Sequence, residues 1–439
     1  MKMNILHIAV HLGGGAGKAI AGIAVQGQQD AGDHHRILLL DAPEKDGWVR
    51  YCLERQVPVA QWDGSPAPFS WADVVVVSWW NHPVMARFLA NFPPCAGARV
   101  LWCHVNGVHY PILPFRLASA FDRVMFTSPY SLQNPAWSED ERQVIRENAS
   151  LIYGMGQFRP ADMPYKRGRR SGETFVVGYV GTLNYGKLHP NFLSYCQAAC
   201  ERVPELHFVM IGDRNPELER AVRAAGLTSR FTFTGFVNDA ATRMLEFDVF
   251  GYLLNPAHYG TTENVLLEAM ACGLPVIALR QNVEQFIVPP DAGFLVDNPQ
   301  QYAERLAYLR HHPQACAAMG ENARRHVLST YDARQNAANF HSACMSSCAG
   351  EKKKPPIPLG DSPWEWFLAC LSGQDRARFS AIAQALSSDT PAGRERAIRL
   401  SRDCPPIFRE KRKSSLLHFA DTYPEDAVLT SISTIMRQE

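Results

Sequence analysis

Continuous apolar runs, separated by segments of helical length, recur along most of the chain. In the first part they fall at 4–10, 35–40, 73–80, 98–105 and 122–128. Continuous rather than alternating apolar runs are typical of parallel strands that are buried on both faces. The pattern predicts a doubly wound α/β domain, in which ligands bind at the carboxyl ends of the strands.

A second series of apolar runs begins at 175–181 and continues to 293–297. Helices are predicted over 302–330 and 331–346, and the polar, basic stretch 166–172 separates the two series. After the Lys- and Pro-rich stretch 351–358, the pattern predicts three or four short helices, the first starting at Ser362-Pro363. The predicted organisation is a domain over 1–165, a second domain over 172–346, a linker over 347–361 and a helical extension over 362–439.

One stretch of the second series, 258–279, predicts a loop, a helix, a tight Gly-x-Pro stop and a strand. Thr261 and Thr262 are suited to cap the helix, and Glu263 suits the positive end of its dipole. A helix start offers N–H groups to an anion such as a phosphate. Glu268 lies one turn further on, and its side chain leans back toward the helix start. A phosphate beside a hydroxyl indicates a nucleotide ligand.

The run from Asn264 to Ile277 resembles the signature of family-4 retaining glycosyltransferases of the GT-B fold. The resemblance implies two doubly wound Rossmann-like domains facing a cleft, and a nucleotide-sugar donor. The family signature has two glutamates separated by seven residues, and the second of them lies within this run. Glu268 matches the second Glu, which the family uses on the donor ribose. The first Glu falls on Gly260, and whether Glu263 replaces it is open.

Other motifs extend the resemblance across residues 4–346. The family's "Gly-Arg-leu-x-x-x-Lys" run, which holds the donor diphosphate, corresponds to Gly181, Thr182 and Lys187, with Thr182 in place of the Arg. Gly235 and Phe236 fall in the segment that lies against the donor base. The resemblance therefore implies a donor site made of Gly13, Gly14, Gly15, Gly181, Thr182, Lys187, Gly235, Phe236, Gly260, Thr261, Thr262, Glu263, Asn264 and Glu268.

The glycine-rich loop after the first strand fits neither common phosphate motif. A P-loop would need Gly at Leu12 and Ser or Thr at Ala19, and the dinucleotide fingerprint fails at Lys18 or Ile20. The loop resembles the one that faces the cleft in GT-B N-terminal domains. A simple strand-to-helix turn is the alternative.

The resemblance places a histidine near the transferred sugar, and His104, at the end of a predicted strand, matches it. It implies His104, Lys187 and Glu268 as the catalytic residues, with Asn106 and His109 on the acceptor side. A lone histidine is as often a satisfied structural residue.

Composition narrows the remaining choices. The net charge of +1 gives no argument for nucleic acid, and no apolar run is long enough to span a membrane. Eleven scattered cysteines suggest reduced thiols and a cytoplasmic protein. The basic stretch 166–172 leaves contact with an inner membrane face open, although a solvated linker is the favoured interpretation. No Asp-x-Asp pair occurs, so a metal-bridged diphosphate is not favoured.

The sequence thus predicts a metal- and cofactor-independent retaining glycosyltransferase that uses a front-face mechanism. The acceptor class is open between a carbohydrate, a lipid-linked molecule and a protein. The resemblance to the family implies an envelope polysaccharide. An epimerase or phosphorylase on the same fold is one alternative. A binding protein that lost catalysis is another, favoured by Gly260 and Thr182. The extension over 362–439 has no derived role; packing on the other domains and homo-oligomer formation are both open.

Overall fold

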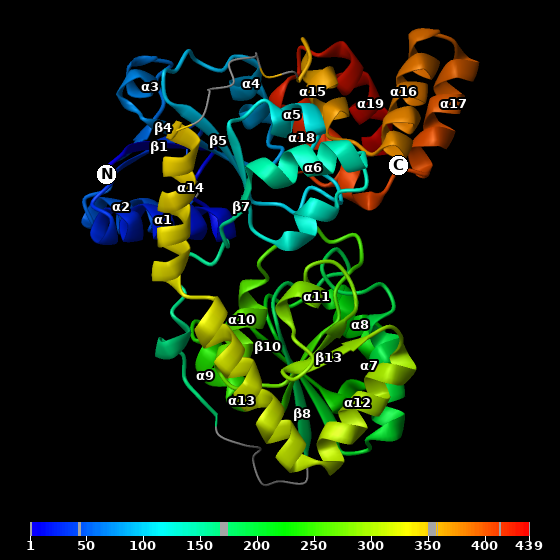
Figure 1. Cartoon of the computed structure of the whole chain (residues 1–439). Helices are drawn as coiled ribbons and strands as arrows, with labels where there is room; N and C mark the ends of the chain where they lie inside the picture. The colour runs from blue at the N-terminus through cyan, green and yellow to red at the C-terminus, as the bar shows by residue number, and fades with distance from the viewer. Residues whose placement is uncertain are drawn as a thin grey trace. The chain divides into compact units, whose positions relative to one another are not determined.

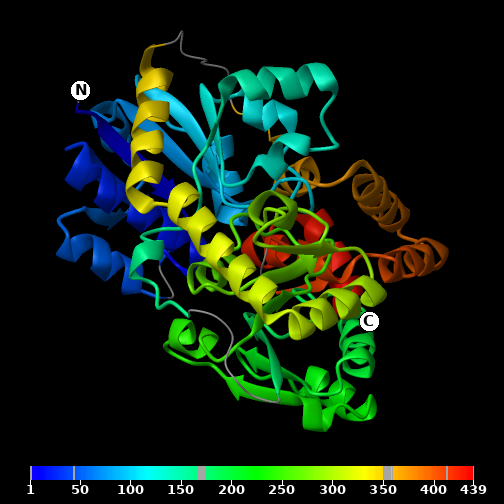
Figure 2. The same ribbon diagram turned by 60° about the horizontal axis from the view of Figure 1, so that its bottom comes forward.

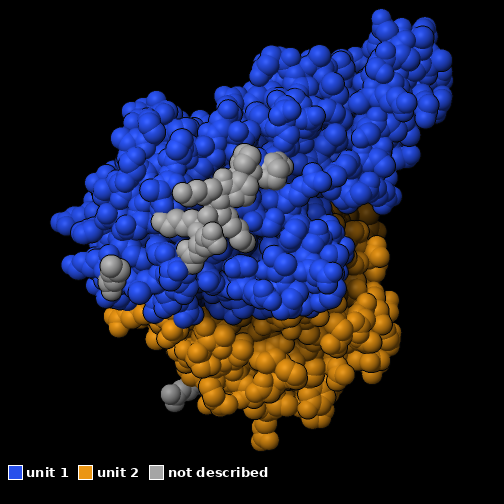
Figure 3. Space-filling model, turned by 45° about the horizontal axis from the view of Figure 1, so that its top comes forward, with its two compact units in different colours: residues 1–157, 336–439 blue, residues 158–335 orange. Residues whose placement is uncertain are grey.

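The computed structural model describes residues 2–42, 45–166, 174–349, 357, 359–411 and 414–438. The chain divides into two compact units, residues 1–157 with 336–439, and residues 158–335 (Figures 1 and 3). Each unit contains one parallel sheet covered by helices. Most of the two predicted linkers, 166–172 and 347–361, lies outside the described residues.

The sheet of the first unit has seven parallel strands in the order β3-β2-β1-β4-β5-β6-β7. Five of them fall on the predicted apolar runs. The two edge strands, β3 and β7, were not predicted because each has only three residues and neither is apolar throughout. The strands are β1 (Asn4–Ala9), β2 (His34–Leu39), β3 (Val59–Gln61), β4 (Val74–Trp79), β5 (Ala98–Cys103), β6 (Arg123–Phe126) and β7 (Ala149–Leu151).

The sheet of the second unit has six parallel strands in the order β10-β9-β8-β11-β12-β13, and β8, β12 and β13 fall on the runs predicted at 175–181, at the end of 258–279 and at 293–297. The order reverses between β8 and β11, as in dinucleotide-binding sheets, and ligands bind at such switch points. The loops that follow β8 and β11 therefore lie next to each other. The strands are β8 (Phe175–Val180), β9 (Leu206–Ile211), β10 (Phe231–Gly235), β11 (Val249–Tyr252), β12 (Val276–Leu279) and β13 (Gly293–Val296).

Helices connect the strands in both units. The predicted helical stretch 302–330 is two helices, because Pro313 has no N–H to continue the first one and begins the second. The helices are α1 (Gly14–Asp30), α2 (Gly47–Glu54), α3 (Ala67–Trp71), α4 (Pro83–Ala90), α5 (Phe115–Ser119), α6 (Glu139–Asn148), α7 (Phe192–Arg202), α8 (Pro216–Ala224), α9 (Ala240–Met244), α10 (Asn264–Ala271), α11 (Glu284–Ile287), α12 (Pro299–His311), α13 (Pro313–Thr330) and α14 (Ala333–Ala349).

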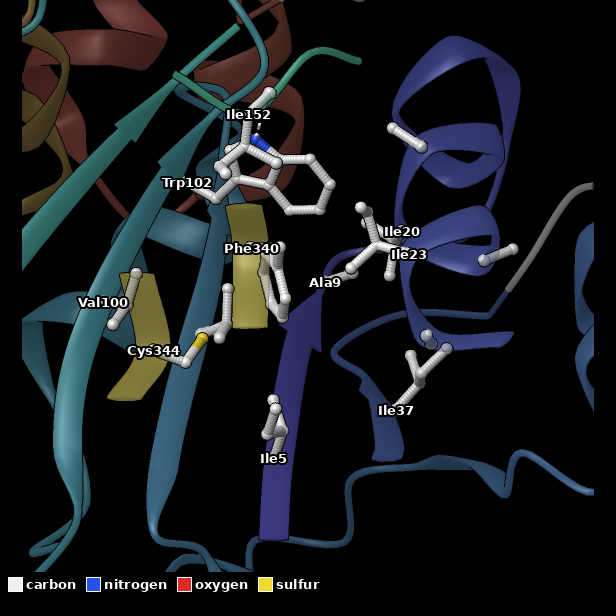
Figure 4. Close-up of a cluster of buried hydrophobic side chains, with 14 of the residues drawn as sticks. Ile5, Ala9, Ile20, Ile23, Ile37, Val100, Trp102, Ile152, Phe340 and Cys344 are labelled. Atoms are coloured by element: carbon white, nitrogen blue, oxygen red, sulfur yellow. Dashed lines mark hydrogen bonds between the residues drawn. The ribbon is translucent and has the colours of Figure 1, made fainter. Parts of the chain in front are cut away.

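From residue 336 onward, α14 belongs to the first unit, where it crosses the strands of the N-terminal sheet (Figures 1 and 2). Phe340 lies beside Trp102 in a cluster of buried hydrophobic side chains (Figure 4). The Phe340 ring also stacks on the ring of His7. The distance between His7 Nε2 and His35 Nδ1 is 2.8 Å. Burial lowers the pKa of His7 to about 3, so this polar pair is neutral inside the core.

The described residues of the C-terminal extension form five α-helices, where three or four were expected. The first begins at Pro363, as predicted, and the Ser362 side chain caps it. Within the first unit, the extension packs on the N-terminal part: the Tyr423 hydroxyl donates to the carbonyl of Pro83 (2.6 Å), and the N–H of Ile112 donates to the carbonyl of Cys370 (2.8 Å). These contacts fall on the segments that follow β4 and β5. The helices are α15 (Pro363–Ala369), α16 (Gly373–Ser387), α17 (Pro391–Arg402), α18 (Leu416–Thr422) and α19 (Ala427–Gln438).

In the described part of the chain, no helix has both the length and the apolar character needed to cross a bilayer.

Candidate functional site

The start of α10 differs from the prediction in one respect. Neither Thr261 nor Thr262 caps the helix; Glu263 is the N-cap residue, in the left-handed conformation (φ 45°, ψ 62°). The Glu263 side chain makes no cap hydrogen bond, because its carboxylate points toward Lys187. The carboxylate of the N-cap residue therefore does not occupy the positive end of α10.

Glu263 and Lys187 form the centre of a buried polar cluster. The Lys187 ammonium lies 2.7 Å from Glu263 Oε2 and 2.7 Å from His258 Nε2. The Tyr252 hydroxyl donates to the same Oε2. The sequence predicted Lys187 and Glu263 separately, but not their contact, and it missed His258 and Tyr252. The positions of these two residues could have indicated them, because Tyr252 ends a strand and His258 opens the loop before α10.

Electrostatics keep the Glu263 side chain ionised. Burial alone would raise its pKa, but the charges of Lys187 and His258, with hydrogen bonds from Lys187 and Tyr252, lower the pKa to about 2. Its side chain is only 5% exposed. At neutral pH the centre of the cluster is therefore a carboxylate with a paired ammonium in a largely desolvated place.

Two loops fix the backbone of Lys187. Its N–H donates to the carbonyl of Asn184 (3.0 Å), and its carbonyl accepts from the N–H of Asn255 (2.8 Å). The Asn255 side-chain amide also donates to the carbonyl of Tyr185 (2.8 Å). The loop after β8 is thus tied to the loop after β11, at the switch point of the sheet. Thr182 in the first of these loops is exposed.

Glycines end the three neighbouring strands β8, β9 and β10. Gly181, Gly212 and Gly235 all have positive φ, and a Cβ on Gly212 would lie 2.0 Å from the carbonyl oxygen of Gly181. This edge of the sheet therefore presents bare backbone. Phe236 follows Gly235 and is 73% exposed, a high value for a large apolar side chain. Glu268 lies half-buried in the second turn of α10.

Glu284, at the start of α11, is a buried acid that the sequence did not single out as a site residue. Its side chain is fully buried. Burial and the nearby charge of Glu263 raise its pKa to about 8, although its own backbone N–H, Lys187 and Gln281 act in the opposite direction. At neutral pH it is therefore mostly a neutral carboxylic acid.

Glu284→Gln is expected to change the pH dependence of stability. The folded pKa of about 8 exceeds the ordinary value of 4.5, so the folded state holds the extra proton between these values. Wild-type stability then falls as pH rises from 4.5 to 8, by up to ~1.4 kcal/mol per pH unit, whereas Gln does not titrate. Denaturant unfolding at pH 5 and pH 8 should show the variant gaining relative to wild type at pH 8. Equal gains at both pH values would contradict the assignment, and Glu304→Gln, an exposed change, should show no pH-dependent gain.

In the first unit, the glycine loop lies where the sequence predicted, between β1 and α1. Gly13 is the N-cap residue and its N–H donates to His11 Nδ1 (3.0 Å). Gly14 needs to be glycine because its φ is +62°, while Gly15 has open space around it. The backbone conformation of the turn thus accounts for the glycine at position 14. Gly14 and Gly15 are both exposed, so their backbone is accessible.

His104 follows β5 directly, and its ring packs 4.5 Å from the ring of Trp102. Burial, and then the nearby His7, lower its pKa to about 3, so it is a neutral imidazole at physiological pH. Its Nε2 has no hydrogen-bond partner among the described residues. Asn106 uses its side-chain oxygen to accept from the N–H groups of Val108 and His109, which shapes the loop. The His109 Nε2 lies 3.2 Å from the Tyr130 hydroxyl.

Comparison with known proteins supports the same interpretation. Residues 174–312 match the family model described as "Glycosyl transferases group 1". The putative glycosyltransferase EpsD of Bacillus subtilis (strain 168) is 27% identical over 218 residues, which cover 46% of this chain and 56% of EpsD. The 2-deoxystreptamine N-acetyl-D-glucosaminyltransferase of Streptomyces fradiae is 39% identical over 108 residues, 23% of this chain and 25% of that enzyme. The chain thus spans about half the length of the first relative and a quarter of the second.

Solved structures share the architecture. HepE of Anabaena, solved in complex with UDP, superposes with a TM-score of 0.61 at 19% identity, over 78% of this chain and 100% of HepE. A glycosyltransferase from Rickettsia africae gives a TM-score of 0.60 at 13% identity, over 80% of this chain and 100% of its own. The predicted resemblance to family-4 glycosyltransferases is confirmed by these matches. The chain has the GT-B fold, and its residues 174–312 match the model of the group 1 glycosyltransferases.

Proposed function

We propose that this protein is a glycosyltransferase that moves a sugar from a nucleoside diphosphate sugar to a hydroxyl of an acceptor. The observation that carries the proposal is the half-buried ammonium of Lys187 at the switch point of the second sheet, within the matched glycosyltransferase domain. A cation fixed at such a place stabilises the charge that develops on a departing diphosphate.

The proposed donor site lies within the second unit. The first turn of α10, with Asn264, would receive phosphate oxygens, and Glu268, in the second turn, would accept hydrogen bonds from the ribose hydroxyls. Thr182, exposed after the glycine that ends β8, would donate a hydrogen bond to the diphosphate in place of the family's Arg. Gly235 and Phe236 would border the base.

Sugar transfer needs no enzymatic nucleophile in this proposal. The leaving diphosphate itself accepts the proton of the acceptor hydroxyl, on the face from which it departs, so that the anomeric configuration is retained. Lys187 stabilises the diphosphate as the glycosidic bond breaks. His104, neutral and with Nε2 lacking a partner among the described residues, would hydrogen-bond the transferred sugar, with Gly13, Gly14 and Gly15 beside the donor and Asn106 and His109 toward the acceptor.

The acceptor and the cellular location also belong to the proposal. We propose an acceptor hydroxyl on a glycan or other small polyol, since one relative is named for transfer to 2-deoxystreptamine. Lipid-linked and protein acceptors are tested in the same assays. We propose a cytoplasmic location, with contact to the inner membrane face as the alternative.

A thermal-shift screen against nucleotide sugars tests the donor class. UDP, UDP-glucose, UDP-N-acetylglucosamine, GDP-mannose and ADP-glucose are added at equal concentration, with UDP first because HepE was solved with it. A ligand present at 100 times its Kd stabilises the folded state by about 2.7 kcal/mol, so one base should raise the Tm clearly. Matching hydrolysis or transfer of that nucleotide sugar is then measured. No shift and no turnover with any donor would refute the proposal.

A further inference from the structure

The Glu263 carboxylate occupies the space of an absent side chain. A Cβ placed on Gly260 would lie 1.8 Å from Glu263 Oε1 and 1.9 Å from Cε1 of His258. Real Cβ atoms do not approach so closely, so any side chain at position 260 would displace Glu263 or His258. A side chain at position 260 is therefore incompatible with the observed placement of Glu263 and His258.

Glu263 is also the partner in this cluster that accepts from the Lys187 ammonium whichever tautomer His258 adopts. His258 Nδ1 lies 3.1 Å from the N–H of Gly260, and His258 Nε2 lies 2.7 Å from the Lys187 ammonium. An imidazole ring has at most one nitrogen lone pair free to accept, so these two donors cannot both be satisfied by His258. The Glu263 carboxylate accepts from Lys187 in either tautomer, and the hydroxyl of Tyr252 fixes the same oxygen.

The second carboxylate oxygen is not turned outward either. Glu263 Oε1 lies 3.5 Å from His258 Nε2 and against the backbone of Gly260. With the side chain 5% exposed, a sugar hydroxyl could reach it only after the cluster had rearranged. The backbone of Glu263 is held in the left-handed conformation, which a non-glycine residue adopts only when the surrounding structure fixes it.

From this geometry we infer that Glu263 is a positioning residue, which holds the Lys187 ammonium in place for the donor diphosphate and does not bind the donor sugar. A lysine side chain is long and flexible, and it loses conformational freedom when it binds an anion. In this cluster the ion pair with Glu263 already restricts the Lys187 side chain before the ligand binds. The inference rests on the proposed function and deepens it, since it separates diphosphate binding from sugar recognition.

The test is a double-mutant cycle on ligand affinity. Inorganic pyrophosphate, UDP and UDP-glucose are titrated by calorimetry into wild type, Glu263→Gln, Lys187→Met and the double variant. Glu263→Gln keeps the shape of the side chain but removes its charge, and it is expected to weaken all three ligands by a similar factor of about ten. In the Lys187→Met background the same change should cost almost nothing more, because the effect passes through Lys187.

Other outcomes overturn the inference in distinct ways. If Glu263 contacts the sugar, Glu263→Gln weakens UDP-glucose and leaves UDP and pyrophosphate unchanged. Equal losses in both backgrounds would mean that Glu263 acts independently of Lys187. Wild-type affinity in Glu263→Gln, in a protein that binds nucleotides, refutes the inference alone. Failure of wild type to bind any of the three ligands refutes the proposed donor site and the inference with it.

Two further variants guard against a simple loss of folding. Tyr252→Phe removes the hydroxyl from the same carboxylate oxygen and should give a smaller loss of the same pattern, which provides the test if Glu263→Gln does not fold. Glu205→Gln breaks an ion pair with Arg310 elsewhere in the second unit and should leave all three affinities unchanged.

Discussion

Replacing Glu268 by alanine is expected to lower kcat/KM for the nucleotide sugar by at least about 100-fold, to the limit of detection. The physical reason is the loss of the proposed hydrogen bonds between a carboxylate and two ribose hydroxyls. Hydrogen bonds to charged groups contribute about 1.5–3 kcal/mol each, and about 1.4 kcal/mol corresponds to a factor of ten. The measurement is steady-state turnover of the donor found in the thermal-shift screen, with calorimetric titration of UDP beside it.

The pattern across ligands distinguishes this role from a general loss of structure. Glu268→Ala should weaken UDP strongly and inorganic pyrophosphate hardly at all, because pyrophosphate has no ribose. Glu321→Ala, an exposed substitution on α13 of the same unit, should have wild-type turnover. Full activity in Glu268→Ala would refute the assignment of the ribose contact. Equal losses for UDP and pyrophosphate would instead indicate damage to α10.

Strong periodicity made most of the fold predictable. The apolar runs that became β1, β4, β5, β11 and β12 are continuous, and their burial on both faces leaves little ambiguity. The edge strands β3 and β7 carry no such pattern, since an edge strand is short and partly exposed. The break at Pro313 was in principle visible, because proline cannot continue a helix through its missing N–H.

The site was predictable as a set of residues but not as a set of contacts. Lys187 and Glu263 are separated by 76 positions, and only the order of the strands brings their loops together. Thr262 has a good capping side chain, yet the left-handed backbone of Glu263 makes Glu263 the N-cap residue. The Glu263 side chain is held by Lys187, a tertiary contact that the local capping preference does not include. Glu284 was likewise missed because its raised pKa arises from burial against Glu263, which no local pattern reports.

The second large effect concerns the core of the first unit. Phe340→Ala is expected to lower the free energy of unfolding of this unit by about 3–5 kcal/mol, since truncation of a buried phenylalanine removes apolar contacts and leaves a cavity. Phe340 is 1% exposed, and its ring centre lies 5.7 Å from that of His7 and 5.8 Å from that of Trp102. A cavity here also lets water approach His7 and His35, whose neutrality depends on burial. Thermal and denaturant unfolding give the measurement.

The matched control lies on the same helix. Met345→Ala removes a large side chain from α14 that is 40% exposed, so its cost should be well below that of Phe340→Ala. The destabilisation by Phe340→Ala should shrink below about pH 6.5. Wild type loses stability there because the unfolded His7 takes up a proton that the buried His7, with a pKa of about 3, does not, and water in the cavity would raise the folded pKa toward 6.5 and reduce that loss. Equal costs for the two substitutions would mean that α14 contributes little to the first unit. Since α14 supplies Phe340 and Cys344 to a core otherwise built from 3–152, we expect the two substitutions to differ by several degrees in Tm.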